Sequence, residues 1–203
     1  QTEDDGIAAL AYSPCTVKTQ VGVNKTDVTI IENTLYPFGD KIDFDLRMNK
    51  AVAFPLKLRI PWWCREATVL LNGKQLRVAP GGQVIAINRV WENFDKVTLH
   101  LPMEVTTSSW GRNSRTVERG PLVYALKVGE RWEKGTHEIE GDYFSVYPTE
   151  PWNYGLVQDN VKNPKENLQV KIKPFPKTFK WNLEHAPIEI VASAKQIRGW
   201  KAV

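Results

Sequence analysis

Three adjacent side chains, Trp62, Trp63 and Cys64, form the densest chemical group in the sequence. Two indole rings beside a thiol could supply an aromatic platform next to a nucleophile. A cysteine nucleophile needs a base or a positive environment that favours the thiolate. Arg65 follows directly, but no histidine stands close in the sequence. The pattern favours a half-buried structural thiol at the corner of a sheet, with the aromatic platform as the alternative.

The other candidate groups do not assemble into a catalytic set. His100, His137 and His185 stand apart, and none lies at metal-ligand spacing from another histidine or from a cysteine. Carboxylates cluster at residues 3–5 and 138–142 without the spacing of a calcium-binding helix–loop–helix motif. Two carboxylates that act as acid and base need a fixed separation in a cleft, which the sequence alone does not assemble. We predict no catalytic residue and no metal ligand in this chain.

Composition indicates an ordinary soluble globular protein. The chain has 203 residues, of which 42% are hydrophobic and 25% charged. No run of about 18 apolar residues is present, so we expect no membrane partner. The first residues, QTEDDGIAALAYSP, lack the charged and apolar regions of a signal peptide. A mature secreted protein or a portion of a longer chain would begin in the same way.

The basic charge does not indicate a nucleic-acid partner. The formal net charge is +4, and six lysines fall between residues 161 and 181. Nucleic-acid binding would require arginine and aromatic side chains interleaved in a recognisable module, which is not found. A solvated, lysine-rich loop and edge strand accounts for the excess.

Alternation of apolar and polar residues dominates the chain. It is clearest at residues 42–48, 54–60 and 97–101, where every second side chain is apolar. This period of two is typical of antiparallel strands with one buried face. No long window keeps a period of 3.6, so we expect no long helix. Further strands are predicted at residues 7–12, 27–32, 67–71, 84–88, 122–128, 143–147, 168–173 and 188–192.

A proline before the tryptophan pair and an Asn-Gly pair after it predict that the two tryptophans lie at a corner of the sheet. Pro61 cannot donate a backbone hydrogen bond, so it should end the strand at residues 54–60 or lie on an edge. One of the two tryptophans should then cover the open end of the core. The next strand leads into Asn72-Gly73, which predicts a two-residue hairpin turn with positive φ at both positions.

The predicted fold is all-β, with two antiparallel β-sandwich domains in tandem. We place the first domain at residues 1–104 and the second at residues 105–203. After Met103 most side chains are small and polar, and the second half is richer in tryptophan and proline.

Four blocks in fixed order carry a family resemblance: LKLRIPWWCREATVLLNGKQL, INRVWENFDKVTLHLPMEV, VERGPLVYALKVGERW and PWNYGLV. They cover about residues 54–157, and the stretch LAYSPCTVKTQVGV before them also fits. Together they resemble the β-region of the β-L-arabinofuranosidase family, glycoside hydrolase family 127, formerly domain of unknown function 1680.

The resemblance implies an (α/α)₆ catalytic barrel followed by two β-sandwich domains. In the family a glutamate acid/base and a cysteine nucleophile act beside zinc, which is held by cysteines, two of them adjacent, and a glutamate. Cys15 and Cys64 are 49 positions apart (64 − 15) and fall in the β-region, so they do not match that adjacent pair. Zinc is therefore expected only in the absent catalytic domain, and the chain is expected to be truncated at both ends.

The function that the resemblance implies is a non-catalytic accessory β-sandwich module of a family 127-like glycosidase, inactive alone. Its expected partners are the catalytic barrel of the parent chain, a plant-type glycan and a second copy of the chain. A bacterial periplasmic or secreted location is favoured over the cytoplasm. The alternative is a carbohydrate-binding module in which Trp110, Trp152 and Tyr154 stack on sugar rings, because these aromatics fall in irregular segments.

Overall fold

The computed structural model describes residues 1–176 and 178–200. Lys177, one of the six lysines counted above, and residues 201–203 lie outside the described residues. The chain divides into two compact units, Gln1–Glu104 with Gly120–Leu122, and Val105–Arg119 with Val123–Val203. The all-β prediction is confirmed, because strands form the sheets of both units.

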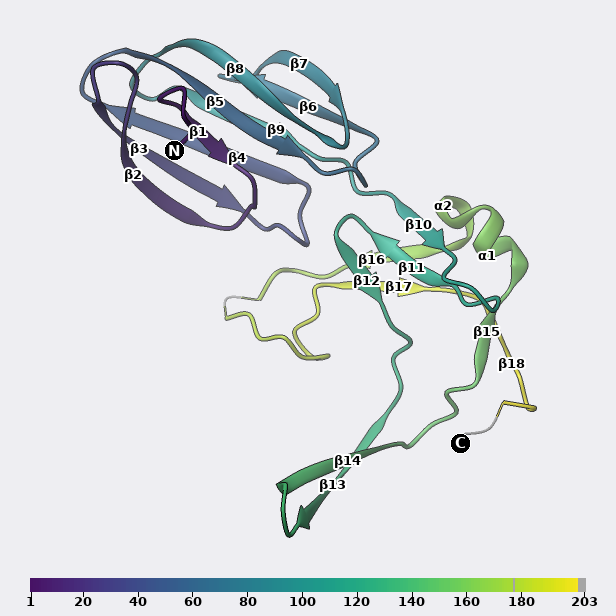
Figure 1. The fold of residues 1–203 in the computed structure, drawn as a ribbon. Coiled ribbons are helices and arrows are strands. Elements are labelled where there is room, and N and C mark those ends of the chain that lie inside the picture. Colours follow the sequence, from purple (N-terminus) through teal and green to yellow (C-terminus); the bar gives the residue numbers. More distant parts are fainter. Residues whose placement is uncertain (177, 201–203) are drawn as a thin grey trace. The chain divides into compact units, whose positions relative to one another are not determined.

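Two sheets form the first unit (Figure 1). The larger sheet has six antiparallel strands in the order β2-β3-β4-β9-β6-β7, and the smaller has the order β1-β5-β8. Strand β1 runs parallel to β5, and β8 runs antiparallel to it. The strand bounds are β1 Ile7–Ala9, β2 Cys15–Val21, β3 Thr26–Thr34, β4 Lys41–Met48, β5 Val52–Ile60, β6 Glu66–Leu71, β7 Lys74–Pro80, β8 Gln83–Trp91 and β9 Lys96–His100.

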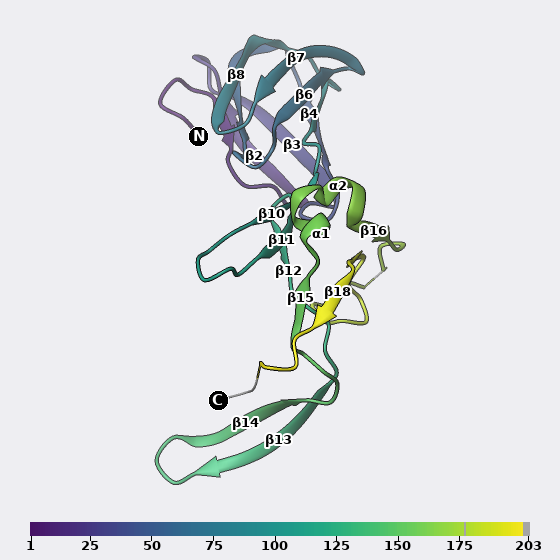
Figure 2. The ribbon, with the colours of Figure 1, turned by 90° about the vertical axis from the view of Figure 1, so that its right-hand side faces the viewer.

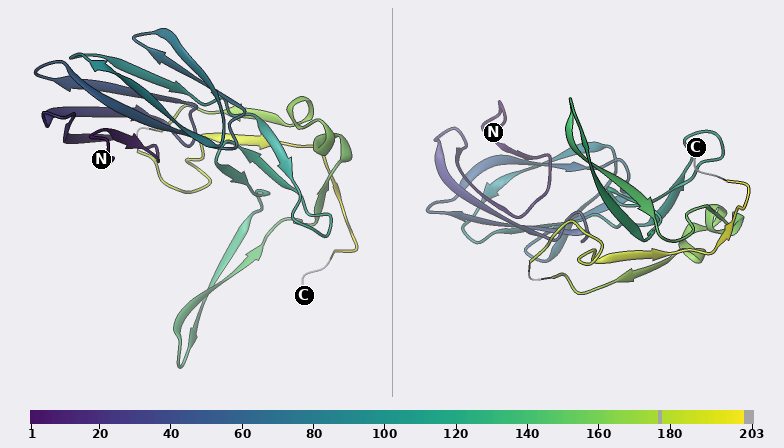
Figure 3. Two further views of the ribbon diagram at one scale, coloured as in Figure 1. Left: turned by 45° about the horizontal axis from the view of Figure 1, so that its top comes forward. Right: turned by 90° about the horizontal axis from the view of Figure 1, so that it is seen from below.

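The alternating apolar residues of β4 and β5 form the core of this sandwich, as the sequence predicts. Every second residue of β4 and of β5 is buried, and these side chains join one hydrophobic cluster with side chains of both sheets. Figure 3 shows the strands of this unit from two further sides. Burying apolar surface stabilises the fold by about 25 cal/mol per Å², so the two central strands contribute a large share of the unit's stability.

The corner at residues 61–64 forms as predicted. Strand β5 ends at Ile60, directly before Pro61. Cys64 is fully buried in the core, and Trp63 packs against that core, whereas Trp62 is 85% exposed. The corner also lies against Gly81, where an added Cβ would meet the carbonyl oxygen of Cys64 at 2.2 Å. Trp63 therefore covers the open end of the core, and Cys64 is a structural thiol.

The hairpin turn between β6 and β7 is also confirmed. Asn72 has φ of 51° and Gly73 has φ of 79°, the left-handed values that a type I′ turn requires. The pairing of the two strands shifts register between Val69 and Leu70, where an irregularity interrupts the ladder.

Smaller sheets form the second unit. Strands β10-β11-β12 make a three-stranded sheet, and β13-β14, β15-β18 and β16-β17 are two-stranded. Figure 2 shows β13 and β14 as a long ribbon closed by one turn. The bounds are β10 Val105–Ser108, β11 Thr116–Arg119, β12 Leu122–Tyr124, β13 Glu130–His137, β14 Gly141–Pro148, β15 Tyr154–Leu156, α1 Gln158–Lys162, α2 Pro164–Asn167, β16 Gln169–Ile172, β17 Ile188–Val191 and β18 Ala194–Gln196.

Few side chains are buried in the second unit. Among its described residues the buried apolar side chains are Val105, Leu168, Pro187 and Ile188. The buried Asn160 donates a hydrogen bond to the carbonyl oxygen of Ser193 at 2.5 Å. Within the described part of the chain, neither helix is long or apolar enough to cross a membrane.

Candidate functional site

One thiol and one carboxylate do lie close together in the first unit. Cys15 on β2 and Glu32 on β3 are directly paired across the ladder, so their side chains share a face. The Cys15 Sγ donates to Glu32 Oε2 at 3.9 Å, and the backbone N–H of Ser13 donates to Glu32 Oε1 at 2.8 Å. The residues are 17 positions apart, and only the strand pairing brings them together.

The electrostatics of this pair oppose nucleophilic chemistry. Desolvation raises the pKa of the Cys15 thiol, and the negative charge of Glu32 raises it further. A thiol acts as a nucleophile only as the thiolate, which a raised pKa disfavours. Burial likewise raises the pKa of the Cys64 thiol. Neither cysteine has the environment of a catalytic residue, and both are free thiols.

Glu32 is the buried acid whose ionisation should control pH stability. Burial raises its pKa above the ordinary 4.5. The Glu32 carboxyl group therefore loses its proton at a lower pH in the unfolded chain than in the folded chain. As the pH rises from about 4.5 to the raised pKa, the free energy of unfolding falls. We expect Glu32→Gln to be more stabilising at pH 7 than at pH 4, measured as the urea midpoint.

Glu150→Gln is the control for loss of a carboxylate that is exposed rather than buried. An equal effect of Glu32→Gln at pH 4 and pH 7 would contradict the assigned role of Glu32.

A shallow hollow of about 530 Å³ lies beside the loop between β3 and β4. Asp40 and Asp43 line it, and a histidine or lysine side chain lies beside each carboxylate. Asp40 Oδ2 is 3.2 Å from His100 Nε2, and Asp43 Oδ2 is 3.2 Å from the ammonium groups of Lys41 and Lys96. Desolvation opposes ionisation of Asp43, but hydrogen bonds from Thr98 and the lysines outweigh it and lower its pKa. Asp43 therefore stays ionised and cannot serve as a general acid near neutral pH.

The described residues hold no group of three or more histidine, cysteine, aspartate or glutamate side chains placed to bind a metal ion. The zinc that the family resemblance implies thus has no matching donor set in the part of the chain that the structure describes.

The three aromatics predicted to bind sugar all lie in the second unit. Trp110 lies in the loop between β10 and β11 and is 79% exposed, with its indole N–H donating to Ser108 Oγ at 2.9 Å. Trp152 and Tyr154 are each 38% exposed and are neighbours, because the Tyr154 N–H donates to the Trp152 carbonyl oxygen at 3.0 Å. Whether they bind a sugar stays a prediction.

A second hollow, of about 420 Å³, includes one of these aromatics. Trp152 lines it together with residues from the start of β13 and the end of β14. Its lining residues are Val128, Gly129, Glu130, Val146, Tyr147, Pro148 and Trp152. Two aromatic rings beside one carboxylate are a combination that can hold a sugar ring by stacking and hydrogen bonding.

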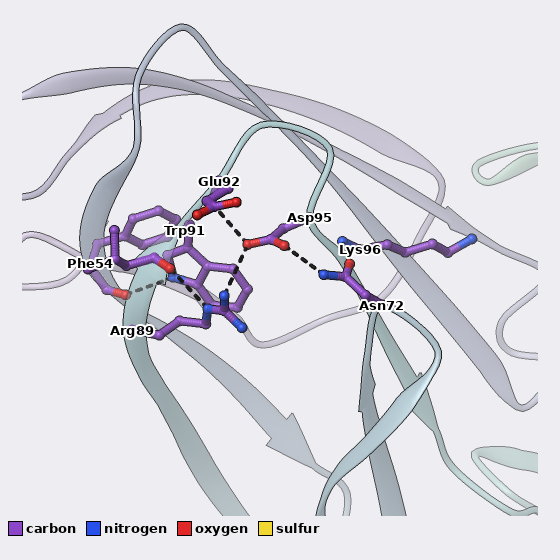
Figure 4. A network of polar contacts seen from close by, with 8 residues as sticks. Phe54, Asn72, Arg89, Trp91, Glu92, Asp95 and Lys96 are labelled. Atoms are coloured by element: carbon purple, nitrogen blue, oxygen red, sulfur yellow. Dashed lines mark hydrogen bonds and ion pairs between the residues drawn. The ribbon is translucent and has the colours of Figure 1, made fainter.

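A polar network that the sequence did not predict joins the turn at Asn72, the loop between β8 and β9, and Arg89 on β8 (Figure 4). Asp95 Oδ1 accepts a hydrogen bond from Asn72 Nδ2 at 2.8 Å, and Asp95 Oδ2 accepts one from the Glu92 N–H at 2.9 Å. The Arg89 guanidinium lies 3.6 Å from Asp95 Oδ2 and above the ring of Trp91.

Backbone groups complete this network. Asn72 Oδ1 accepts from the Lys96 N–H, and the Asn72 N–H donates to the Lys96 carbonyl oxygen, both at 2.8 Å. The hairpin turn at Asn72 is thereby fixed to the start of β9. Each acceptor oxygen of Asp95 is engaged by the protein, so the network is structural and holds one end of the sandwich.

Residues 6–103 match the model of a family described as "Beta-L-arabinofuranosidase, GH127 middle domain". Ara127N-Se, a GH127 β-L-arabinofuranosidase from Geobacillus stearothermophilus T6, aligns with a TM-score of 0.57 and 20% identity, over 96% of this chain and 31% of that chain. A structure described as a glycoside hydrolase gives 0.56 and 23%, over 95% and 32%.

A GH127 β-arabinofuranosidase gives a TM-score of 0.53 and 17% identity, over 71% of this chain and 31% of that chain. This chain thus spans about a third of the length of the solved structures that it matches. No curated protein matches the sequence.

Proposed function

We propose that this chain is the β-sandwich portion of a family 127-like glycoside hydrolase and supports an (α/α)₆ catalytic barrel, because residues 6–103 match the model of the GH127 middle domain. The family assignment confirms the resemblance carried by the sequence blocks. This match is the observation on which the proposal rests, and it agrees with the alignment of this chain to about a third of each of two longer glycoside hydrolase chains.

The chemistry of the described residues supports a non-catalytic role. The one thiol–carboxylate pair has a protonated thiol, and Asp43 stays ionised through its hydrogen bonds and lysines. A glycosidase needs one carboxyl group that donates a proton and a second group that acts as base or nucleophile. Glu32 has the raised pKa of an acid and Asp43 stays ionised, but Glu32 pairs with Phe44 and Asp43 with Asn33, so the two carboxyl groups lie on opposite faces of the sheet. The first unit therefore does not bring the two roles together, and we assign the reaction on a plant-type arabinoside to the proposed barrel.

Strand β8 offers a surface on which such a barrel could pack. It is an edge strand of the β1-β5-β8 sheet, and the outward side chains Val84 and Val90 are exposed. Apolar side chains that line an uncovered edge strand favour contact with another domain. We propose this edge as the supporting surface.

The purified chain is expected to show no turnover of an aryl β-L-arabinofuranoside above the rate of buffer alone. The physical reason is the absence, among the described residues, of an acid and a thiolate placed together. Release of the aryl alcohol, followed by absorbance, provides the measurement. Cys15→Ser is the matched variant, because Cys15 is the thiol that contacts a carboxylate. Turnover that follows the chain through purification and disappears in Cys15→Ser would overturn the proposal.

The hollow beside Trp152 favours carbohydrate binding as a second candidate function. If this function is correct, arabino-oligosaccharides should bind the chain, and Trp152→Ala should weaken binding at least about tenfold, through loss of a stacking ring. Isothermal titration calorimetry measures the affinity. Trp62→Ala is the matched control, because Trp62 is exposed and belongs to the other unit. Equal affinities of the wild type and of Trp152→Ala would exclude this site.

A further inference from the structure

The basic excess of the whole chain equals the charge of one short segment. Residues 171–181, KIKPFPKTFKW, carry four lysines and no acidic residue. The chain has 27 lysines and arginines and 23 acidic residues, so outside this segment the two charges balance at 23 each (27 − 4). A run of like charges is usually a solvated face. Here the strands β16 and β17 and the loop between them add further features to that charge.

Strands β16 and β17 form a sheet with one basic face. Lys171 pairs with Glu189 across the ladder, so their side chains share a face. The Lys173 N–H donates to the carbonyl oxygen of Pro187 at 2.7 Å and continues the pairing by one residue. The opposite face carries three buried or half-buried apolar residues, Val170, Ile188 and Ile190. The basic face is therefore the one that the sheet presents to solvent, with Lys171 and Lys173 exposed.

Three ammonium groups act on a single carboxylate of this face. The Lys173 ammonium donates to Glu189 Oε1 at 2.6 Å. This hydrogen bond lowers the pKa of the Glu189 carboxyl group, and the charges of Lys127 and Lys171 lower it further. One ionised carboxylate balances one of the three lysines, so positive charge remains for a ligand that brings its own carboxylate.

Three aromatic rings of the loop between β16 and β17 contact one another. The rings of Phe175 and Phe179 are stacked, with centroids 5.3 Å apart and an angle of 22° between their planes. Trp181 meets Phe179 edge to face, with centroids 5.1 Å apart. These contacts position the Trp181 side chain, although 74% of this residue is exposed. The loop thus presents a supported indole ring to solvent, in the same segment as the lysines.

A combination of lysines and one exposed indole suits an acidic sugar better than a nucleic acid. Residues 171–181 contain no arginine, the side chain that recognises phosphate through two parallel hydrogen bonds. Single-stranded nucleic acid needs separate aromatic platforms for successive bases, whereas these three rings contact one another. A sugar that carries a carboxylate needs one ring to stack on and one ammonium group to pair with.

We propose that the basic face of β16 and β17 and the ring of Trp181 bind an acidic oligosaccharide, with its carboxylates at Lys171 and Lys173 and one sugar ring on Trp181. The choice of a saccharide among anionic ligands rests on the proposed function as part of a glycoside hydrolase. The residues differ from those of the hollow beside Trp152, so each site can be altered separately. Exposed charges contribute weakly, so we expect a dissociation constant of about 0.1–1 mM at low salt.

Isothermal titration calorimetry of the 203-residue chain with tetragalacturonate tests the proposal. The fully methyl-esterified tetramer has the same rings without the charges, and it should bind at least about tenfold more weakly. The double variant Lys171→Gln with Lys173→Gln should bind the acidic tetramer about tenfold more weakly, because two ammonium groups are removed. Lys18→Gln with Lys50→Gln is the matched control, because it removes the same charge from exposed positions of the first unit and should leave the affinity unchanged.

Glu189→Gln distinguishes ligand binding from a purely structural role of the lysines. Glu189 competes with a ligand carboxylate for the Lys173 ammonium. Its replacement should therefore strengthen binding of the acidic tetramer by about threefold or more, although it removes an ion pair from the fold. An unchanged or weaker affinity of Glu189→Gln would contradict the proposed position of the ligand.

Trp181→Ala should weaken binding about tenfold through loss of the stacking ring, and Trp62→Ala, at an exposed tryptophan of the first unit, should not. No binding of the acidic tetramer, equal affinity for its ester, or equal losses in the two double-lysine variants would each overturn the proposal. Binding of a short oligothymidylate as tight as that of the tetramer would also overturn it, in favour of general attraction of anions. Trp152→Ala should bind the acidic tetramer as the wild type does. Failure of the acidic-sugar site would leave the proposed support of a barrel standing, because the turnover assay tests that function separately.

Discussion

Replacing Trp91 with alanine is expected to lower the free energy of unfolding of the first unit by about 3–5 kcal/mol, as for other large aromatic residues removed from a core. Trp91 is completely buried, and its indole N–H donates to the carbonyl oxygen of Phe54 at 2.9 Å. Its ring also contacts Phe54, with centroids 5.7 Å apart. Alanine would leave a cavity between the two sheets and an unsatisfied carbonyl oxygen. Urea unfolding followed by far-ultraviolet circular dichroism measures the loss.

Trp62→Ala is the matched control for this experiment. Trp62 is the same residue type in the same unit but is exposed, so its removal should change stability by no more than about 0.5 kcal/mol. Similar losses for the two tryptophans would show that the core does not depend on Trp91.

Asp95→Ala is expected to cost about 2–3 kcal/mol, because hydrogen bonds to a charged group are stronger than neutral ones and their loss leaves buried partners unpaired. Asp95 is buried and holds Asn72, the Glu92 N–H and Arg89 at once (Figure 4). The loss should appear as a lower urea midpoint. Asp27→Ala is the control, since exposed Asp27 accepts a single side-chain hydrogen bond from Gln20 and should cost little.

A double-mutant cycle separates the network from the individual side chains. Asn72→Ala and Asp95→Ala remove two ends of one hydrogen bond, so the double variant should lose less stability than the two losses added together. Strict additivity would mean that the turn at Asn72 and the loop at Asp95 are energetically independent.

Sequence patterns predicted the strands that have one buried face. Strands β4 and β5 lie inside the sheets and bury every second side chain, so the core imposes alternation on their sequence. The turn at Asn72-Gly73 was predictable because only a few residue types tolerate positive φ at both positions. Pro61 marked the end of β5 for an equally local reason, the missing backbone donor.

Two edge strands were not predicted, because most of their side chains are exposed and need not be apolar at every second position. Strands β2 and β7 are outermost in the six-stranded sheet, and most of their residues are exposed. Their sequences, CTVKTQV and KQLRVAP, therefore lack a strong apolar period. Strand β13 has four charged side chains among its first five residues, and its strand structure is evident only from its pairing with β14.

The polar contacts could not be predicted from the sequence either. Asn72 and Asp95 are 23 positions apart, and Cys15 and Glu32 are 17 apart. Each pair meets only through strand pairing or loop packing, for which the individual residues carry no local signal. Cys64 was predicted as a half-buried structural thiol at a corner, and the structure buries it completely.

The position of β9 constrains the order in which the first unit can assemble. It is the last strand of this sandwich in the chain, yet it lies between β4 and β6 in the larger sheet. Until residues 96–100 have left the ribosome, the larger sheet can form only as two separate parts, β2-β3-β4 and β6-β7, each with an unpaired edge. Closure then joins segments about 55 residues apart, as in the pairing of Asp43 with Thr98. Such distant contacts slow folding and leave unpaired edges exposed to aggregation during synthesis.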